Sequence, residues 1–210
     1  MPEAPDGYPV PAGRCRRELE AQRSRFIATL GPAATPEEAR ALLDDVAQEF
    51  PDATHHCWAF VAGSPGSTTH IGMSDDGEPH GTAGRPILEV LLHSGIGEVA
   101  AVVTRYYGGT NLGKGGLARA YGGAASAALE EIPTVRKVER VAFRLRLEYA
   151  WLDPFRREVE DAGGELTDEA FGEHVDLTLR VPISSVQRLR DALARMSGGA
   201  AGEWTALEPS

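Results

Sequence analysis

The feature that most restricts the fold of this chain is a run of glycines near its middle. Seven of the sixteen residues from Gly108 to Gly123 are glycine. The run follows EVAAVVTRYY, an apolar, β-branched stretch typical of a buried strand, and it continues into GLARAYGGAASAALEEI, whose small residues predict a helix. Because Gly122 and Gly123 each cost a helix about 1 kcal/mol relative to alanine, we expect that helix to pack tightly against a sheet.

Hydrophobic patterning around this run predicts an α+β domain over residues 17–135. SRFIATL predicts a first strand, and Thr35 with Pro36 and Glu38 predicts a capped helix that ends near Pro51. HHCWAFVAG and THIGMS lie on either side of a Ser-Pro-Gly-Ser turn and predict a hairpin. A second helix is expected over residues 85–93.

The rest of the chain, residues 136–210, predicts a second domain. VAFRLRLEY, GELTDEAF, HVDLTLRVP and EWTALE have strand character, whereas DPFRREVEDAGG and SSVQRLRDALARM have helix character, with Asp153 as the expected cap of the first helix. The order is βαββαβ, the split pattern of a ferredoxin-like domain. We place a linker at residues 133–140 and treat residues 1–16 as an N-terminal tail. The fold class is therefore α+β with two domains.

Charge excludes a globally basic nucleic-acid wrapper, because 21 Lys and Arg stand against 31 Asp and Glu, for a net charge of −10. The charge is uneven, however. From Val99 to Leu129 there are three basic residues, Arg105, Lys114 and Arg119, and no acidic residue. Since screening limits charge effects to about 8–10 Å, this segment can attract an anion despite the acidic remainder.

The sequence predicts a cytoplasmic protein with no membrane partner. It has no stretch of 18 apolar residues, and its N-terminus lacks the basic start and apolar core of a signal peptide. Cys15 and Cys57 are too few for a disulfide framework and lack zinc-site spacing. We expect both to be reduced thiols.

The Gly-rich loop is the first candidate site. GGTNLGK fits GxxxxGK between a predicted strand and helix, where backbone amides can hold an anion. Gly115 stands where a nucleotide-hydrolysing loop needs Ser or Thr, which argues against an ATPase or GTPase. The simpler alternative is that the glycines serve only a turn and helix packing. The predicted nucleic-acid or anion site comprises Arg105, Tyr106, Tyr107, Gly108, Gly109, Gly113, Lys114, Gly115, Gly116 and Arg119.

The second candidate is the acidic turn SDDGEP, with three carboxylates in four residues. Such a turn can bind Mg²⁺ or hydrogen-bond a ligand, although solvated acidic turns are commoner. No cofactor is expected, Mg²⁺ is the alternative, and no metal is assigned. A zinc site or a Cys-His nucleophile pair is disfavoured because adjacent strand residues point to opposite faces. The candidate ligand or cation contacts are His56, Asp75, Asp76, Glu78, Thr82 and Arg85.

Taken together, HHCWAFVAG, SDDGEPHGTAGRP and RYYGGTNLGKGGLARAYGG resemble the IMPACT family, in particular its bacterial YigZ-type members, over residues 17–129. The resemblance implies an N-terminal domain similar to the second domain of a small-subunit ribosomal protein. It also implies a C-terminal domain similar to the last domain of elongation factor G, and a role in translation regulation. No catalytic residues come with the family.

These observations support one leading hypothesis and two alternatives. The leading hypothesis is a non-enzymatic cytoplasmic protein that binds RNA or the ribosome through the Gly-rich segment and modulates translation. The first alternative is a Mg²⁺-dependent enzyme, or a sensor, of a phosphorylated small molecule held by the same residues. The second is a protein-interaction module whose glycines are architectural and whose partner is a translation factor or another protein.

Overall fold

The computed structural model describes residues 7–199 and 204–207. The chain divides into two compact units, Tyr8–Lys137 and a C-terminal unit that begins at Val138. Both units combine helices with antiparallel strands, so the predicted two-domain α+β fold is confirmed. Within the described residues, no helix is both long and apolar enough to span a bilayer.

A five-stranded sheet forms the centre of the N-terminal unit, in the order β2-β3-β6-β4-β5 with every neighbouring pair antiparallel. The strands are β2 (Cys15–Ala21), β3 (Ser24–Pro32), β4 (His55–Val61), β5 (Ile71–Ser74) and β6 (Val99–Tyr106). The central strand β6 is buried along its length up to Tyr106. Its continuous apolar sequence therefore reflects a strand covered on both faces.

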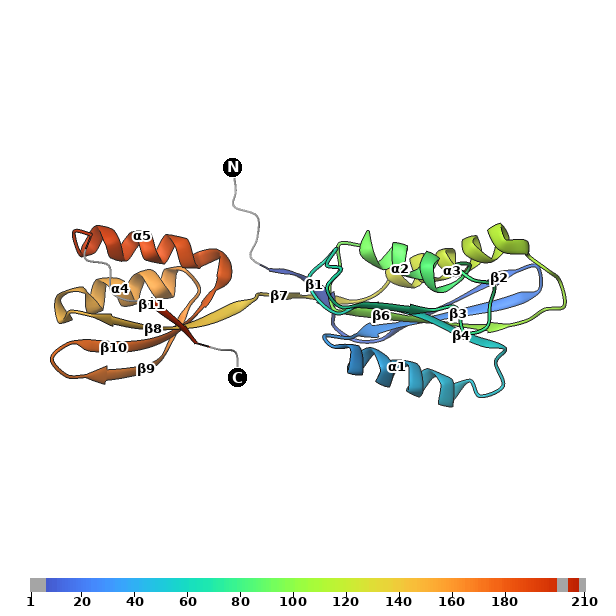
Figure 1. Ribbon diagram of the computed structural model, residues 1–210, viewed down its shortest axis with the longest axis horizontal. Coiled ribbons are helices and arrows are strands. Elements are labelled where there is room, and N and C mark those ends of the chain that lie inside the picture. The colour runs from blue at the N-terminus through green and yellow to red at the C-terminus, as the bar shows by residue number, and fades with distance from the viewer. Residues whose placement is uncertain (1–6, 200–203, 208–210) are drawn as a thin grey trace. The chain divides into compact units, whose positions relative to one another are not determined.

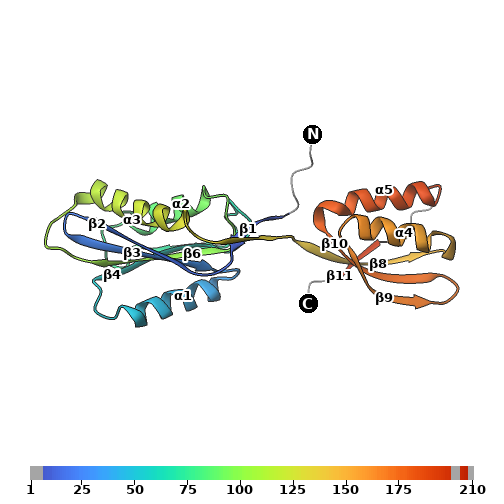
Figure 2. The same cartoon turned by 180° about the vertical axis from the view of Figure 1, so that it is seen from behind.

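Helices cover both faces of this sheet (Figures 1 and 2). The helix α1 (Pro36–Glu49) lies on one face, and α2 (Gly84–Leu92) and α3 (Gly113–Leu129) lie on the other. Alternation along the strands divides the core accordingly, since Cys57 and Val103 join the cluster under α2 and α3, whereas Phe60 and Val102 join the cluster under α1. The predicted cap of α1 is confirmed: Thr35 Oγ1 accepts the Glu38 amide at 3.2 Å.

Three strands of the N-terminal unit were not predicted from the sequence. Residues 8–11, in the expected tail, form β1 (Tyr8–Pro11), which pairs with β7 (Thr134–Lys137) inside the expected linker. Both are four-residue strands, too short to show a periodic pattern. The edge strand β2 reads CRRELEA, whose charged residues protect an edge but hide its strand character.

The C-terminal unit has the predicted βαββαβ order. It consists of β8 (Arg140–Leu147), α4 (Tyr149–Asp161), β9 (Glu165–Phe171), β10 (Val175–Pro182), a short 3₁₀ turn η1 (Ile183–Ser185), α5 (Val186–Met196) and β11 (Trp204–Leu207). The sheet order is β11-β8-β10-β9, and α4 and α5 lie together over one face of the sheet (Figure 1).

The predicted start of the first helix in this unit is wrong. The N-cap of α4 is Glu148, and Asp153 lies inside the helix, 3.2 Å from Arg156 in an ion pair. The Asp-Pro pair at 153–154 resembles a cap followed by proline at the first helical position. The helix begins before that pair, and its apolar face already includes Leu152, which is buried one residue before Asp153.

Candidate functional site

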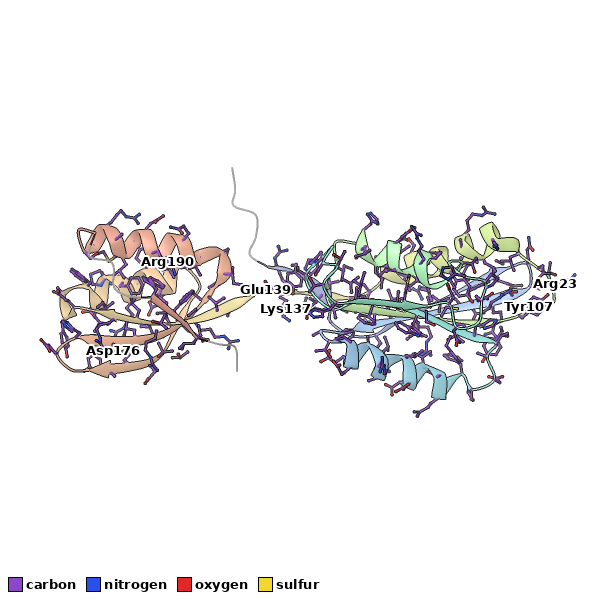
Figure 3. The ribbon with its side chains drawn as sticks, viewed as in Figure 1. Arg23, Tyr107, Lys137, Glu139, Asp176 and Arg190 are labelled. Atoms are coloured by element: carbon purple, nitrogen blue, oxygen red, sulfur yellow. The ribbon has the colours of Figure 1, made fainter. Side chains whose placement is uncertain are left out.

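The Gly-rich loop leaves β6 beside the turn between β2 and β3. A Cβ atom on Gly108 would lie 2.0 Å from the carbonyl oxygen of Arg23, so this close approach of two backbones requires glycine. The Gly108 amide donates to Ser24 Oγ at 3.1 Å, and the Tyr107 amide donates to Thr54 Oγ1 at 3.1 Å. Figure 3 shows Arg23 and Tyr107 at the same end of the N-terminal unit.

Arg105 does not lie on the anion-binding surface where the sequence analysis placed it. It is 5% exposed, and its Nη1 donates to Glu78 Oε1 at 2.5 Å. The hydroxyl of buried Tyr121 donates to the same oxygen at 2.7 Å. Arg105 has this position because it shares a face of β6 with Val103, under α3. Both Arg105 and Glu78 are therefore removed from the candidate ligand contacts.

The buried guanidinium instead supports the loop from within. Arg105 Nη2 lies 3.4 Å from Ser24 Oγ, the same hydroxyl that accepts the Gly108 amide. Its Cζ lies 5.2 Å from the centroid of the Tyr107 ring, which is 48% exposed. Arg105 Nε has no hydrogen-bond partner among the described atoms. The Glu78–Arg105 pair thus fixes the point at which the Gly-rich loop begins.

Asp75 caps α2 from nine residues upstream. Its Oδ1 accepts the amides of Ala83 and Gly84 at 3.0 and 2.9 Å, and its Oδ2 accepts the amide of Gly81 at 2.7 Å. Burial by itself raises the pKa of the Asp75 carboxyl, but these amide bonds, from Gly81, Gly84 and Ala83, outweigh it and leave the pKa below its ordinary value. The carboxylate is committed to the helix terminus.

The other predicted ligand or cation contacts also bond within the protein. Asp76 Oδ2 accepts the His56 amide at 2.6 Å, and His56 Nδ1 lies 3.1 Å from Thr104 Oγ1. Two more residues predicted as ligand or cation contacts have internal partners. The Thr82 hydroxyl donates to the Pro79 carbonyl, and Arg85 pairs with Glu89 along α2. In residues 7–199 and 204–207, no group of three or more His, Cys, Asp or Glu side chains is placed to hold a metal.

Cys57 is buried, and its thiol is occupied by an internal hydrogen bond. Its Sγ donates to the Asp75 carbonyl at 3.0 Å. Burial is the main cause that raises the pKa of this thiol to about 12. Burial likewise raises the pKa of the neighbouring Tyr121 hydroxyl. The interior of the acidic loop is therefore a network of hydrogen bonds that stabilises the fold.

The remaining predicted residues do lie at the surface. Lys114 and Arg119 are exposed and form no ion pair with any described residue. Arg119 Nη1 lies 3.6 Å from the position of a Cβ on Gly115, so its guanidinium folds back over the first turn of α3. No side chain caps that helix, whose N-cap is Leu112. Gly109, Gly113 and Gly115 are exposed, and Gly116 is half-buried.

Tyr106 belongs to the opposite face of the sheet from Arg105. Its hydroxyl donates to Asp52 at 2.7 Å, and this hydrogen bond, with some burial, raises the pKa of the phenol. The expectation that the two tyrosines point to opposite faces fits this arrangement, in which Tyr107 is the more exposed. Tyr106 is therefore occupied by an internal partner and is not part of the open loop surface.

Sequence reasoning missed Arg23. It is exposed, and among the described residues its side chain has no hydrogen-bond or ion-pair partner. Gln22 and Arg23 form the two-residue turn between β2 and β3 with φ values of 47° and 67°. Such a turn ordinarily contains Asn-Gly. The residue types at these two positions therefore gave no local signal for a turn. We call Arg23, Tyr107, Lys114, Arg119 and residues 108–116, which form the loop after β6 and the first turn of α3, the Gly-loop surface.

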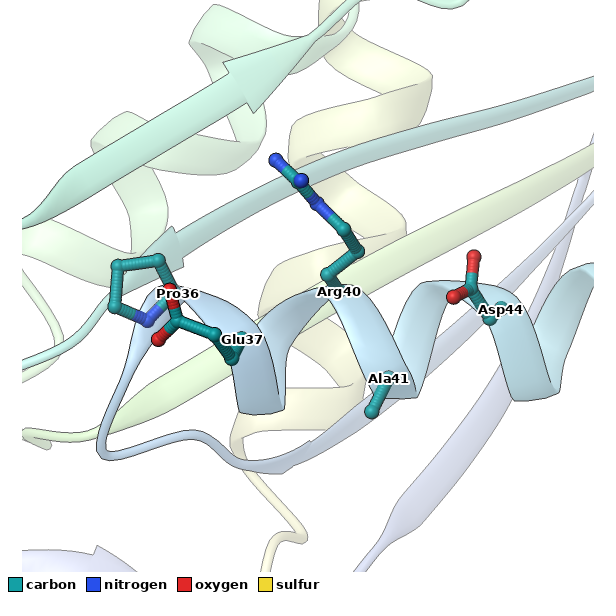
Figure 4. Close-up of a pocket in the computed structure, with 5 residues that line it drawn as sticks. All are labelled: Pro36, Glu37, Arg40, Ala41 and Asp44. Carbon is teal, nitrogen blue, oxygen red and sulfur yellow. The ribbon is translucent and has the colours of Figure 1, made fainter.

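Two hollows elsewhere lack a comparable set of groups. One, of about 250 Å³, lies along α1 and is lined by Pro36, Glu37, Arg40, Ala41 and Asp44 (Figure 4). The other, also about 250 Å³, lies on the C-terminal sheet and is lined by Arg144, Arg146, Asp168, Ala170, Asp176 and Thr178. Both mix acids and bases, and Arg146 is already paired with Asp176 at 2.8 Å.

Comparison with known proteins gives consistent results for both units. The Impact N-terminal domain matches residues 22–129, and a domain of unknown function, DUF1949, matches residues 145–200. The chain is 42% identical over 192 residues to an IMPACT family member of Haemophilus influenzae, covering 91% of this chain and 93% of that protein. It is 40% identical over 194 residues to the IMPACT family member YigZ of Escherichia coli, covering 92% and 95%.

A solved structure titled as that of a hypothetical protein supports the same relationship. It aligns with a TM-score of 0.68 at 38% sequence identity and covers 99% of this chain and 100% of its own. The similarity therefore extends over both units and is not limited to the glycine motif.

Proposed function

The chain belongs to the IMPACT family, and from that premise we propose that it regulates translation by binding RNA or the ribosome through the Gly-loop surface. The family is generally linked to translation regulation. We further propose a cytoplasmic location, where ribosomes and their RNA are available. A translation factor or another protein is an additional partner in this proposal.

One observation carries the proposal: in a chain of net charge −10, exposed cations without ion-pair partners lie on the turn and the helix start that adjoin the segment of an exposed tyrosine, Tyr107. Arg23 comes from the β2–β3 turn, and Lys114 and Arg119 come from the first turns of α3. Arg and Lys side chains are the groups that bind phosphate oxygens, and aromatic rings stack with bases. A polyanion with accessible bases is the ligand that matches this combination.

The contacts of the acidic loop favour this proposal over a Mg²⁺-dependent enzyme or sensor. Asp75 accepts three backbone amides, Asp76 accepts another, and Glu78 is paired with Arg105 in the interior. A cation would have to displace these partners, and breaking the buried pair would leave Arg105 uncompensated. We therefore assign the acidic loop to the stability of the fold.

The test is binding of ribosomes and ribosomal RNA by the full chain. A variant with Arg23→Ala, Lys114→Ala and Arg119→Ala should lose at least tenfold in affinity. For single strands, each phosphate contact contributes about −0.7 to the slope of log K against log salt. Loss of three contacts should therefore make the slope shallower by about 2. Co-sedimentation and fluorescence anisotropy at several KCl concentrations measure both quantities.

The matched control removes three exposed arginines that lie elsewhere and form no ion pair with a described residue. Arg40, Arg157 and Arg195 meet this condition, so the control has the same change in net charge. It should bind within about twofold of wild type. Equal losses in the two triple variants would show that binding follows net charge alone, and unchanged binding in the first would remove the Gly-loop surface from the proposal.

A further inference from the structure

We infer that the Gly-loop surface selects unpaired RNA, with one base stacked on Tyr107 and the neighbouring phosphates bound by Arg23 on one element and Lys114 and Arg119 on another. This rests on the proposed function and adds the class of RNA that the surface selects. The juxtaposition that carries it is an exposed ring, fixed by buried groups, on a segment that adjoins the turn of Arg23 and leads into the helix of Lys114 and Arg119.

The ring of Tyr107 is held in place although it is 48% exposed. Its own amide donates to Thr54 Oγ1, and the following amide donates to Ser24 Oγ. Inside the protein, Arg105 Cζ lies 5.2 Å from the ring centroid, and Arg105 is in turn fixed by Glu78 at 2.5 Å. A ring ordered before binding loses little conformational entropy when a base stacks on it.

The cations are placed to contact phosphates near such a base. The Tyr107–Gly108 segment touches the β2–β3 turn, because a Cβ on Gly108 would meet the Arg23 carbonyl at 2.0 Å. The same segment leads through the loop into Gly113, the first residue of α3, with Lys114 next and the Arg119 guanidinium folded back over Gly115. Positive side chains therefore lie on the two elements that adjoin the Tyr107 segment, the β2–β3 turn and the start of α3.

Base stacking on Tyr107 distinguishes single strands from duplexes. In an A-form duplex the bases stack on one another and cannot cover an outside ring, so a duplex engages only the cations. An unpaired strand engages both the ring and the cations. Stacking of one base on an aromatic side chain commonly accounts for about tenfold or more in affinity, which sets the expected size of the preference.

The experiment measures fluorescence anisotropy of the full chain with a labelled 12-nucleotide oligouridylate and with a labelled 12-base-pair RNA duplex, from 50 to 200 mM KCl. The wild type should bind the single strand about tenfold more tightly than the duplex. Tyr107→Ala should weaken single-strand binding about tenfold without changing its salt slope, and should leave duplex binding unchanged. Tyr107→Phe keeps an aromatic ring and should stay within about twofold of wild type.

The outcomes separate this inference from the function on which it rests. If ribosomes bind and are lost in the Arg23, Lys114 and Arg119 variant, but Tyr107→Ala binds the single strand like wild type, the function stands and the stacking inference is wrong. Equal affinity for the duplex and the single strand, or ribosome binding without oligouridylate binding, also overturns it. Absence of binding to ribosomes and to both RNAs overturns the function and the inference together.

Discussion

Breaking the buried Glu78–Arg105 ion pair on one side should strongly destabilise the N-terminal unit. The two side chains are 4% and 6% exposed, and the Nη1–Oε1 distance is 2.5 Å. Removing one partner of such a pair leaves an uncompensated charge in the interior and costs about 3–5 kcal/mol. Glu78→Gln and Arg105→Met should therefore each lower the free energy of unfolding by about that amount.

The double variant is the decisive measurement. Glu78→Gln with Arg105→Met removes both charges, so its cost should be well below the sum of the two single costs, with a coupling free energy of at least about 2 kcal/mol. The matched control is the Arg85–Glu89 pair on α2, whose side chains are 69% and 58% exposed. Exposed pairs of this spacing contribute about 0.3–0.5 kcal/mol, so its variants should stay near wild type.

Tryptophan placement allows the assay to follow each unit separately. Trp58 is the one tryptophan in the unit Tyr8–Lys137, whereas Trp151 and Trp204 follow Val138. Urea titration of 5-fluorotryptophan-labelled protein, followed by ¹⁹F NMR, should show the Trp58 transition moving to lower urea while the other two transitions stay. Single variants that cost under 1 kcal/mol, or a double variant that costs the full sum, would refute the reasoning.

Three further predictions follow from single contacts. Iodoacetamide at pH 8 should alkylate half-buried Cys15 and spare buried Cys57, whose pKa is raised to about 12, until urea is added; peptide mass spectrometry detects both. Gly108→Ala should destabilise the N-terminal unit by about 1–3 kcal/mol because its Cβ would meet a carbonyl oxygen at 2.0 Å, whereas Gly123→Ala, with open space, should stabilise it by about 1 kcal/mol in urea unfolding. The pKa of Asp75 is lower in the folded protein than in the unfolded chain, so its ionised carboxylate stabilises the fold above about pH 4, and that contribution is lost as the pH falls through the lowered folded pKa. Asp75→Asn should therefore be less stable than wild type at pH 7, and the difference should shrink as the pH falls below about 4.

Sequence periodicity predicted the elements that have strong patterns. The β6 strand, the capped helix α1 and the βαββαβ order could be predicted because apolar periodicity and cap residues lie within one short window. The strands β1, β2 and β7 could not, because their pairing depends on partners elsewhere in the chain. The cap at Asp75 acts on amides six to nine residues away, a distance at which no sequence rule pairs residues.

The candidate site was predicted in part, and Arg105 shows why. Alternation along β6 indicates that Arg105 shares a face with Val103, but a charged residue at a strand end ordinarily reaches water. Its burial depends on an ion pair with Glu78, a residue that lies 27 positions earlier in the sequence. Arg23 was missed for the opposite reason, because its exposure depends on a turn that its residue types do not favour.

The acidic loop and the Gly-rich loop are connected through buried contacts, and these contacts explain how an acidic protein keeps exposed cations in one region. Within the acidic loop, Glu78 neutralises Arg105 in the interior, and Asp75 and Asp76 bond to backbone amides. None of these three carboxylates is paired with Lys114 or Arg119, which lie exposed on α3. Since a neutral buried pair contributes little field outside, it does not offset the exposed cations of the Gly-loop surface. The acidic loop therefore supports the basic surface without cancelling it.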